Sequence, residues 1–191
     1  MIDHVNHYKK SLKALLLNIE KFITFGFGKI RFIDSLSFMG SSLANLTENL
    51  KSKGTDKFKN LNSYFKDYPE DDLELLRQKG LYPYSWVNGD PRKFEQTYLP
   101  PKSAFYDTLK EESVSEQDYL RAQLVWRKFN CKTFKDYHEL YLMTDTLLLA
   151  DIFEEFRNLC LENYHLDPCW FVSAPGLSEG AFLLNISGKY S

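Results

Sequence analysis

The sequence predicts an α/β chain that is mostly helical. A short strand is expected at residues 29–34, where polar and apolar residues begin by alternating and strand formers are frequent. Longer segments repeat apolar residues at helical spacing. Glycine and proline interrupt these segments, above all in an irregular connector from residue 87 to residue 101.

The expected helices follow one another along the chain with recognisable starts. Serines stand at Ser42 and Ser115, where a side-chain oxygen can cap a first turn. An acidic run at 70–76 opens another helix. The helices are expected at residues 5–24, from 43 to about 50, at 70–76, from 115 to 129 and at 133–164.

Bulk composition narrows the class of protein. Of 191 residues, 43% are hydrophobic, which is enough for one sizeable core or a domain and the start of another. The net charge of -2 provides no global basic field, so any nucleic-acid contact must be local. No apolar run approaches the ~20 residues of a membrane span, and no secretion signal is recognised.

The three cysteines predict an intracellular protein, in the nucleus or the cytoplasm. Cys131, Cys160 and Cys169 form no C-x2-C pair, and an odd thiol suits a reducing compartment. Cys160 and Cys169 with His165 could contribute to a metal site, but their spacing matches no common zinc pattern. Packing is the favoured interpretation of these side chains.

Asp145 is the most informative residue, because helical geometry places it on an apolar stripe. Tyr141, Leu148, Ile152 and Phe156 form that stripe. A buried carboxylate needs a cation, a hydrogen bond or an ionic partner, so Asp145 is a candidate metal ligand. The alternative is that Tyr141 is ordinary core and that Asp145 faces a neighbouring Lys or Arg.

Three short motifs occur in a fixed order along the chain. They are Ser35-Leu36-Ser37-Phe38-Met39 (S-L-x2-h), Lys79-Gly80-Leu81-Tyr82 (K-x2-h) and Tyr141-Leu142-Met143-Thr144-Asp145 (Y-x3-D). In this order they resemble the proofreading exonuclease domain of protein-primed family B DNA polymerases. Stretches such as Leu81-Tyr82-Pro83-Tyr84 and Ala174-Pro175-Gly176-Leu177 are similar to the Maverick (Polinton) type or the linear-plasmid type, and the resemblance covers roughly residues 20 to 180.

The resemblance implies a ribonuclease H-like exonuclease fold and a role for each motif. Asp145 would bind Mg²⁺ or Mn²⁺, Tyr141 would orient the attacking water, and Lys79 would assist catalysis. Ser35 and Leu36 would contact single-stranded DNA and the terminal protein that primes synthesis. Taken alone, Ser35 could instead be a cap and Lys79 a solvated residue beside a glycine.

The chain departs from the family pattern in its carboxylates. The family needs a D-x-E motif and a second Asp before the Ser35 motif, and no residue supplies them. The D-x-E at Asp72-Leu73-Glu74 follows the Ser35 motif instead of preceding it, and we interpret it as a solvated helical face. We therefore expect residues 1–165 to be the C-terminal part of the exonuclease domain and 166–191 to be the start of a truncated polymerase domain, a fragment without activity of its own.

The segment 51–66 is the basic and aromatic part of the chain. It contains five lysines and one acid, together with Phe58, Tyr64 and Phe65. Lysines that neutralise phosphates and rings that stack on unpaired bases would hold a single DNA strand, whereas rings pointing into the core would mean an ordinary solvated surface. The DNA-binding candidates here are Lys51, Lys53, Lys57, Lys59 and Phe65.

Two functions from different classes follow. The first is a fragment of a DNA-directed DNA polymerase, whose parent enzyme binds the single-stranded 3′ end, the primer-template and the terminal protein. The second is a non-catalytic helical DNA- or protein-binding remnant of a decayed mobile element. The coding sequence on either side of the chain would discriminate between them.

Overall fold

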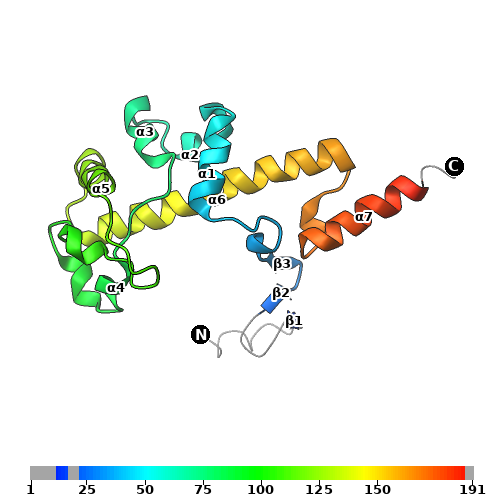
Figure 1. Cartoon of the computed structure of the whole chain (residues 1–191), viewed down its shortest axis with the longest axis horizontal. Helices are drawn as coiled ribbons and strands as arrows, with labels where there is room; N and C mark the ends of the chain where they lie inside the picture. The colour runs from blue at the N-terminus through cyan, green and yellow to red at the C-terminus, as the bar shows by residue number, and fades with distance from the viewer. Residues whose placement is uncertain (1–11, 17–21, 188–191) are drawn as a thin grey trace. The chain divides into compact units, whose positions relative to one another are not determined.

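The computed structural model describes residues 12–16 and 22–187, and this part of the chain is mostly helical (Figure 1). No helix in the described part is long and apolar enough to cross a membrane. The strands are β1 (Leu12–Leu16), β2 (Phe22–Phe27) and β3 (Ile30–Ile33). The α-helices are α1 (Leu43–Ser52), α2 (Lys59–Tyr64), α3 (Glu70–Leu76), α4 (Tyr84–Val87), α5 (Glu116–Lys128), α6 (Phe134–Tyr164) and α7 (Ala174–Ser187).

The chain divides into two compact units, which we describe separately. One combines residues 1–41 with 156–191, and the other comprises residues 42–155. The boundary between these units differs from the domain boundary expected after residue 165, because the N-terminal strands belong to the same unit as the C-terminal segment. The assignment of the two expected segments to exonuclease and polymerase domains stays a prediction.

The helix expected at residues 5–24 is wrong for the described residues, which form strands. β1 pairs antiparallel with β2, and β2 pairs antiparallel with β3. Phe25 and Phe32 stack across β2 and β3 with their ring centroids 4.4 Å apart. Gly28, with φ of 63°, permits the tight turn between β2 and β3. Cross-strand pairing thus overrides the helical spacing of the leucines.

The C-terminal part of the same unit is organised around Asp167. This residue caps the 3-10 helix Pro168–Trp170, and its carboxylate accepts a 2.6 Å hydrogen bond from Arg157. Arg31 of β3 donates to the carbonyl oxygens of Trp170 and Phe171 at 3.3 Å each, which ties the sheet to this segment. Cys160 is buried, and the described residues contain no group of three or more potential metal-ligating side chains.

The other unit confirms most of the expected helices. Ser42 accepts a hydrogen bond from Asn45 N at 3.2 Å and begins α1, and Ser115 accepts one from Asp118 N at 3.0 Å and begins α5. The acidic run forms α3, and α6 extends over 31 residues. The green helices α4 and α5 lie beside the yellow half of α6 in Figure 1. The core of this unit includes Phe58, Leu61, Leu73, Leu76, Phe105, Phe134 and Leu148.

Candidate functional site

Lys79, Tyr141 and Asp145 come together in the unit of residues 42–155. Tyr141 and Asp145 lie one turn apart on α6, and Lys79 lies in the segment that follows α3. The Lys79 ammonium donates to Asp145 Oδ2 at 2.8 Å and to the Tyr141 hydroxyl at 3.2 Å. Two of the three sequence motifs therefore meet at one place, although 62 residues separate Lys79 from Tyr141.

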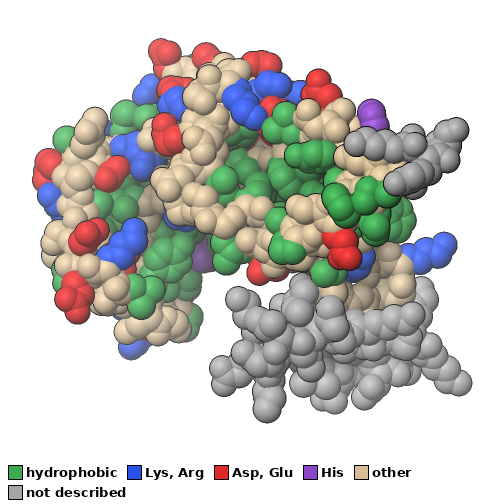
Figure 2. All heavy atoms as spheres, turned by 45° about the vertical axis from the view of Figure 1, so that its right-hand side comes forward, with side chains coloured by type: hydrophobic (Ala, Val, Ile, Leu, Met, Phe, Trp, Pro, Cys, Tyr) green, Lys and Arg blue, Asp and Glu red, His purple; other side chains and the backbone are tan. Residues whose placement is uncertain are grey.

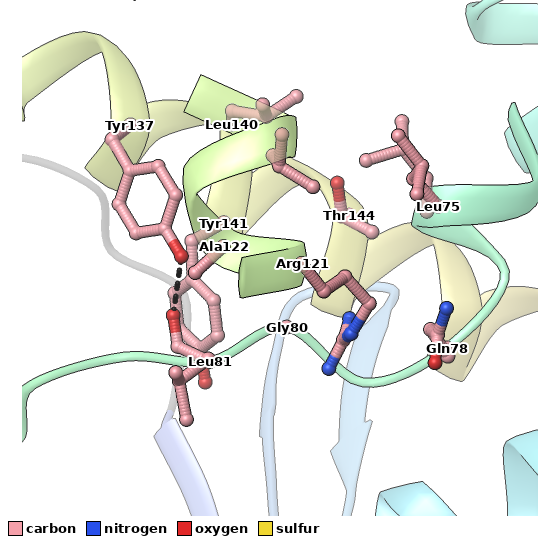
Figure 3. Close-up of a pocket in the computed structure, with 12 residues that line it drawn as sticks. Leu75, Gln78, Gly80, Leu81, Arg121, Ala122, Tyr137, Leu140, Tyr141 and Thr144 are labelled. Carbon is pink, nitrogen blue, oxygen red and sulfur yellow. Dashed lines mark hydrogen bonds between the residues drawn. The ribbon is translucent and has the colours of Figure 1, made fainter. Parts of the chain in front are cut away.

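The backbone around Lys79 is held against α5 and α6 by several contacts. Arg121 of α5 donates to the Lys79 carbonyl oxygen at 3.0 Å, and Tyr137 of α6 donates to the Leu81 carbonyl oxygen at 2.7 Å, the bond dashed in Figure 3. Gly80 allows the closest approach, because a Cβ there would lie 2.7 Å from Cδ2 of Tyr141. Glycine is thus required for close packing here, not for an unusual backbone angle.

A layer of aromatic residues surrounds the Tyr141 ring. Tyr82 stacks on Tyr141 with centroids 4.6 Å apart, and the Tyr84 hydroxyl is hydrogen-bonded to the Tyr141 hydroxyl. Tyr82 OH lies 2.7 Å from Nδ1 of His138. Burial, the Tyr84 hydroxyl and the Asp145 carboxylate raise the pKa of Tyr141 well above its usual range, so its phenol stays protonated. Burial, with a smaller contribution from Tyr84, raises the pKa of Tyr82 to about 12.

The two oxygens of Asp145 are in different situations. Oδ2 accepts from Lys79, whereas Oδ1 is buried and has no hydrogen-bond partner within residues 12–16 and 22–187. The Asp145 side chain is 18% exposed, and Leu148 and Ile152 of the expected stripe are buried. The alternative, in which Asp145 faces a lysine, therefore holds for Oδ2. Oδ1 is still a buried acceptor that needs a hydrogen bond or a cation, which is why Asp145 stays a candidate cation ligand.

Two hollows adjoin these residues. A cavity of about 20 Å³ is lined by Tyr141, Gly80 and Arg121, among others, and Figure 3 shows how α5, α6 and the 78–81 segment enclose it. A larger groove of about 510 Å³ is lined by Lys79, Tyr82 and Tyr84, among others. Asp145 contacts Lys79, which lines the groove, but Asp145 is not itself a lining residue.

The Asp72-x-Glu74 pair is not the solvated face that the sequence suggested. Asp72 is 6% exposed and forms a 2.9 Å ion pair with Lys128 of α5. Glu74 is paired with Lys51. The sequence reading fails because α5 packs against α3 and provides Asp72 with its own cation. Both carboxylates are engaged in joining helices.

The basic segment 51–66 is only partly available for a ligand. Lys51 pairs with Glu74, while Lys53 and Lys57 lie 3.2 and 3.4 Å from the two oxygens of Glu155. Burial raises the pKa of Glu155, but the two lysines outweigh it and lower that pKa overall. Figure 2 shows basic and acidic side chains intermixed along the upper rim of one face. Lys59 is exposed and has no ion pair among the described residues.

The aromatic residues of the same segment correct one expectation. Phe65 is 5% exposed and Phe58 is fully buried, so neither ring can stack on a base in this structure. The Phe65 ring packs edge-on against Phe129 with centroids 5.9 Å apart. Tyr64, which is 57% exposed, is the ring that the segment presents to solvent. Residues 58 and 65 face inward because α2 packs its apolar side on the core.

Ser35 and Leu36 belong to the unit that contains the sheet. They form the 3-10 helix Ser35–Ser37, in which Asp34 accepts a 3.0 Å hydrogen bond from Leu36 N. The cap is therefore Asp34 rather than Ser35. Leu36 is 59% exposed, which leaves its side chain accessible.

Sequence reasoning missed Asp151 as a structurally decisive residue. Asp151 is 2% exposed, and its carboxylate accepts from Asn60 N at 2.7 Å, Asn60 Nδ2 at 2.8 Å and Leu61 N at 3.1 Å. It thereby caps α2 from a distant part of the chain. The sequence offered one signal for this role. Asp151 directly precedes Ile152, which belongs to the expected apolar stripe, and both residues are buried on the inward side of α6.

Comparison with known proteins adds no relative. No protein-family model matches the chain, and neither the curated proteins nor the solved structures contain a significant match. The candidate site therefore rests on its own geometry.

Proposed function

We propose that the chain is part of a protein-primed family B DNA polymerase and contributes the region of its 3′–5′ exonuclease that carries Lys79, Tyr141 and Asp145. The observation that carries this proposal is the convergence of the K-x2-h and Y-x3-D motifs at one ion pair. Chance matches to two short motifs have no reason to meet in space. The ribonuclease H-like fold of the complete domain is part of the proposal.

The chemistry proposed for the site is hydrolysis of a phosphodiester at a 3′ end. Mg²⁺ or Mn²⁺ would supply a Lewis acid there. Asp145 fits as one ligand because its Oδ1 is buried and has no hydrogen-bond partner in the described part of the chain. The remaining carboxylates must come from outside the described residues, which hold no group of three potential ligands. Lys79 neutralises charge beside Asp145, and the protonated Tyr141 hydroxyl positions a water.

The partners follow from the same proposal. The parent enzyme binds single-stranded 3′ ends, primer-template DNA and a terminal protein, and acts inside the cell in the nucleus or the cytoplasm. By itself the 191-residue chain is proposed to lack exonuclease and polymerase activity.

The second candidate is a non-catalytic helical DNA- or protein-binding remnant. It is favoured by the Lys79 ion pair, because Lys79 already compensates Asp145 without any metal. In this case the cluster serves the fold, and no carboxylate supplied from elsewhere would restore chemistry.

The test measures release of nucleotides from a 3′-labelled single strand with Mg²⁺ or Mn²⁺. The chain alone is expected to be inactive. A chain extended at its N-terminus by a segment that carries D-x-E and the second Asp is expected to degrade the strand, and Asp145→Ala in that longer chain is expected to abolish the reaction while binding persists.

The matched control is Glu139→Ala, which removes an exposed carboxylate from the same helix. This variant should retain the activity of the extended chain. An extended chain that folds but never cleaves DNA would favour the non-catalytic remnant. Cleavage by the 191-residue chain that depends on Asp145 would show that the fragment is catalytically complete.

A further inference from the structure

A small hairpin forms one wall of the groove that Lys79 lines. Asp107 and Glu112 exchange two backbone hydrogen bonds of 2.9 and 3.2 Å. Asp107 Oδ1 also accepts from Leu109 N at 2.9 Å and Lys110 N at 3.2 Å, which fixes the tip. The hairpin is tied to the first turn of α4 by a 3.0 Å hydrogen bond between the hydroxyls of Ser85 and Thr108.

The hairpin presents apolar and aromatic surface to solvent. Leu109, at its tip, is 95% exposed, the highest value among the large apolar side chains of the described residues. Tyr106, just before the hairpin, is 41% exposed. Phe105 is buried against Tyr119 and anchors the base of the loop. Because the Leu109 side chain is exposed, it contributes no hydrophobic stabilisation to the fold, although the backbone of the tip is held in place.

One cation of this groove remains open to an anionic ligand. Lys79 and Arg121 are paired with Asp145 and Asp118, whereas the ammonium of Lys110 has no ion pair among the described residues. Of the two acids that line the groove, Asp118 also accepts from the Ser115 hydroxyl at 2.6 Å, and Asp107 accepts backbone hydrogen bonds. A groove with an unpaired ammonium and exposed rings suits an unpaired nucleotide, because the phosphate needs the cation and the base needs the ring.

We infer that the hairpin Asp107–Glu112, together with Tyr106, clamps the unpaired 3′ end of a single DNA strand in this groove. Tyr106 stacks on the terminal base, Leu109 packs against its other side, and Lys110 neutralises the adjacent phosphate. The choice of a 3′ end rests on the proposed function, because Lys79 lies in the same groove. The contact residues themselves follow from the groove alone.

The experiment measures binding of a short single strand to the full chain by fluorescence anisotropy. Leu109→Ser and Tyr106→Ala are each expected to weaken binding about tenfold. Lys110→Ala should weaken it less and reduce the slope of log affinity against log salt by about one. A 2-aminopurine at the 3′ terminus should be quenched on binding, and one at the 5′ terminus should not.

The matched controls are Leu120→Ser, an exposed leucine of α5 outside the groove, and Lys132→Ala, an exposed lysine elsewhere. Both should bind as the parent chain does. Because Leu109 and Tyr106 are exposed, their variants should keep the parent's unfolding temperature. Unchanged affinity in both groove variants, or equal quenching at both termini, would overturn the clamp.

The outcome is separable from that of the proposed function. Weakened binding in the groove variants together with an extended chain that never cleaves DNA would retain the strand clamp and reject the exonuclease. Cleavage that depends on Asp145 together with unaffected binding would retain the exonuclease and reject the clamp.

Discussion

Two carboxylates of α6 are used in contrasting ways. Both carboxylate oxygens of Asp151 accept hydrogen bonds, from two backbone amides and one side-chain amide at the start of α2. In Asp145, Oδ2 accepts from Lys79, whereas the buried Oδ1 has no hydrogen-bond partner among the described residues. Asp151 therefore has a structural role, whereas Asp145 can still accept a hydrogen bond or bind a cation.

The contrast teaches that burial of an acid does not by itself indicate function. Asp151 is 2% exposed and builds the fold, and Asp145, with a side chain 18% exposed, is the functional candidate. What distinguishes them is hydrogen-bond satisfaction. A satisfied acid stabilises, while an unsatisfied one costs free energy that a ligand can recover.

The largest expected effect comes from Asp151→Ala, which should lower the free energy of unfolding by about 3 kcal/mol. The substitution leaves the amides of Asn60 and of the buried Leu61 without their acceptor. Urea denaturation measures the loss. Asp145→Ala is the matched comparison and should cost about 1 kcal/mol or less, since Lys79 can turn to solvent. Equal losses in the two variants would show that hydrogen-bond satisfaction does not distinguish Asp151 from Asp145.

Gly80→Ala should cost about 2 kcal/mol, because the added Cβ would lie 2.7 Å from the Tyr141 ring and would have to displace it. The measurement is again urea denaturation. Gly40→Ala is the control, since a Cβ at that position meets nothing within 4 Å. A neutral Gly80→Ala would mean that the Lys79 segment can move away from α6 freely.

The Lys79–Asp145 pair should contribute a coupling energy of about 1 kcal/mol or less in a double-mutant cycle of Lys79→Met and Asp145→Asn. Both side chains are partly exposed, at 35% and 18%, so water screens the pair. Unfolding free energies of the four chains provide the value. A much stronger coupling would make the pair a structural element like Asp151 and would favour the non-catalytic remnant.

The smallest effect concerns pH and His138. Desolvation, opposed by Glu139, lowers the pKa of His138 from its ordinary 6.5. Between the lowered folded value and 6.5 the unfolded chain binds more protons, so stability should fall as pH falls from 6.5. Thermal unfolding across this window should show the loss in the parent chain and in His165→Asn, the control histidine. His138→Asn should lack it, and a loss of the same size there would assign it to another group.

Much of the helical framework could be predicted from local sequence. Ser42 and Ser115 mark the starts of α1 and α5 because a cap needs only its own first turn. The N-terminal segment could not be predicted in this way. Leucines spaced for a helix became β1 because antiparallel pairing with β2 is a contact between segments, which a periodicity of one segment does not record.

The candidate site likewise has one part that local sequence predicts and one part that depends on contacts between segments. Tyr141 and Asp145 share a face because a helix repeats every 3.6 residues, and this holds wherever the helix lies. Their meeting with Lys79 required the 79–81 segment to pack against α6, which Gly80, Arg121 and Tyr137 secure. The sequence therefore identified the candidates, and only packing could bring them into contact.

The sequence by itself determined the length and start of α6 and the one-turn spacing of its Tyr and Asp, because short-range backbone geometry governs both. Tertiary structure alone decided that Phe65 lies in the core and that Asp72 pairs with Lys128. It also decided that Asp151 caps α2, while Asp145 Oδ1 has no hydrogen-bond partner among the residues that the structure describes. The physical reason is that burial and partner choice depend on residues tens of positions away, which local patterns do not encode.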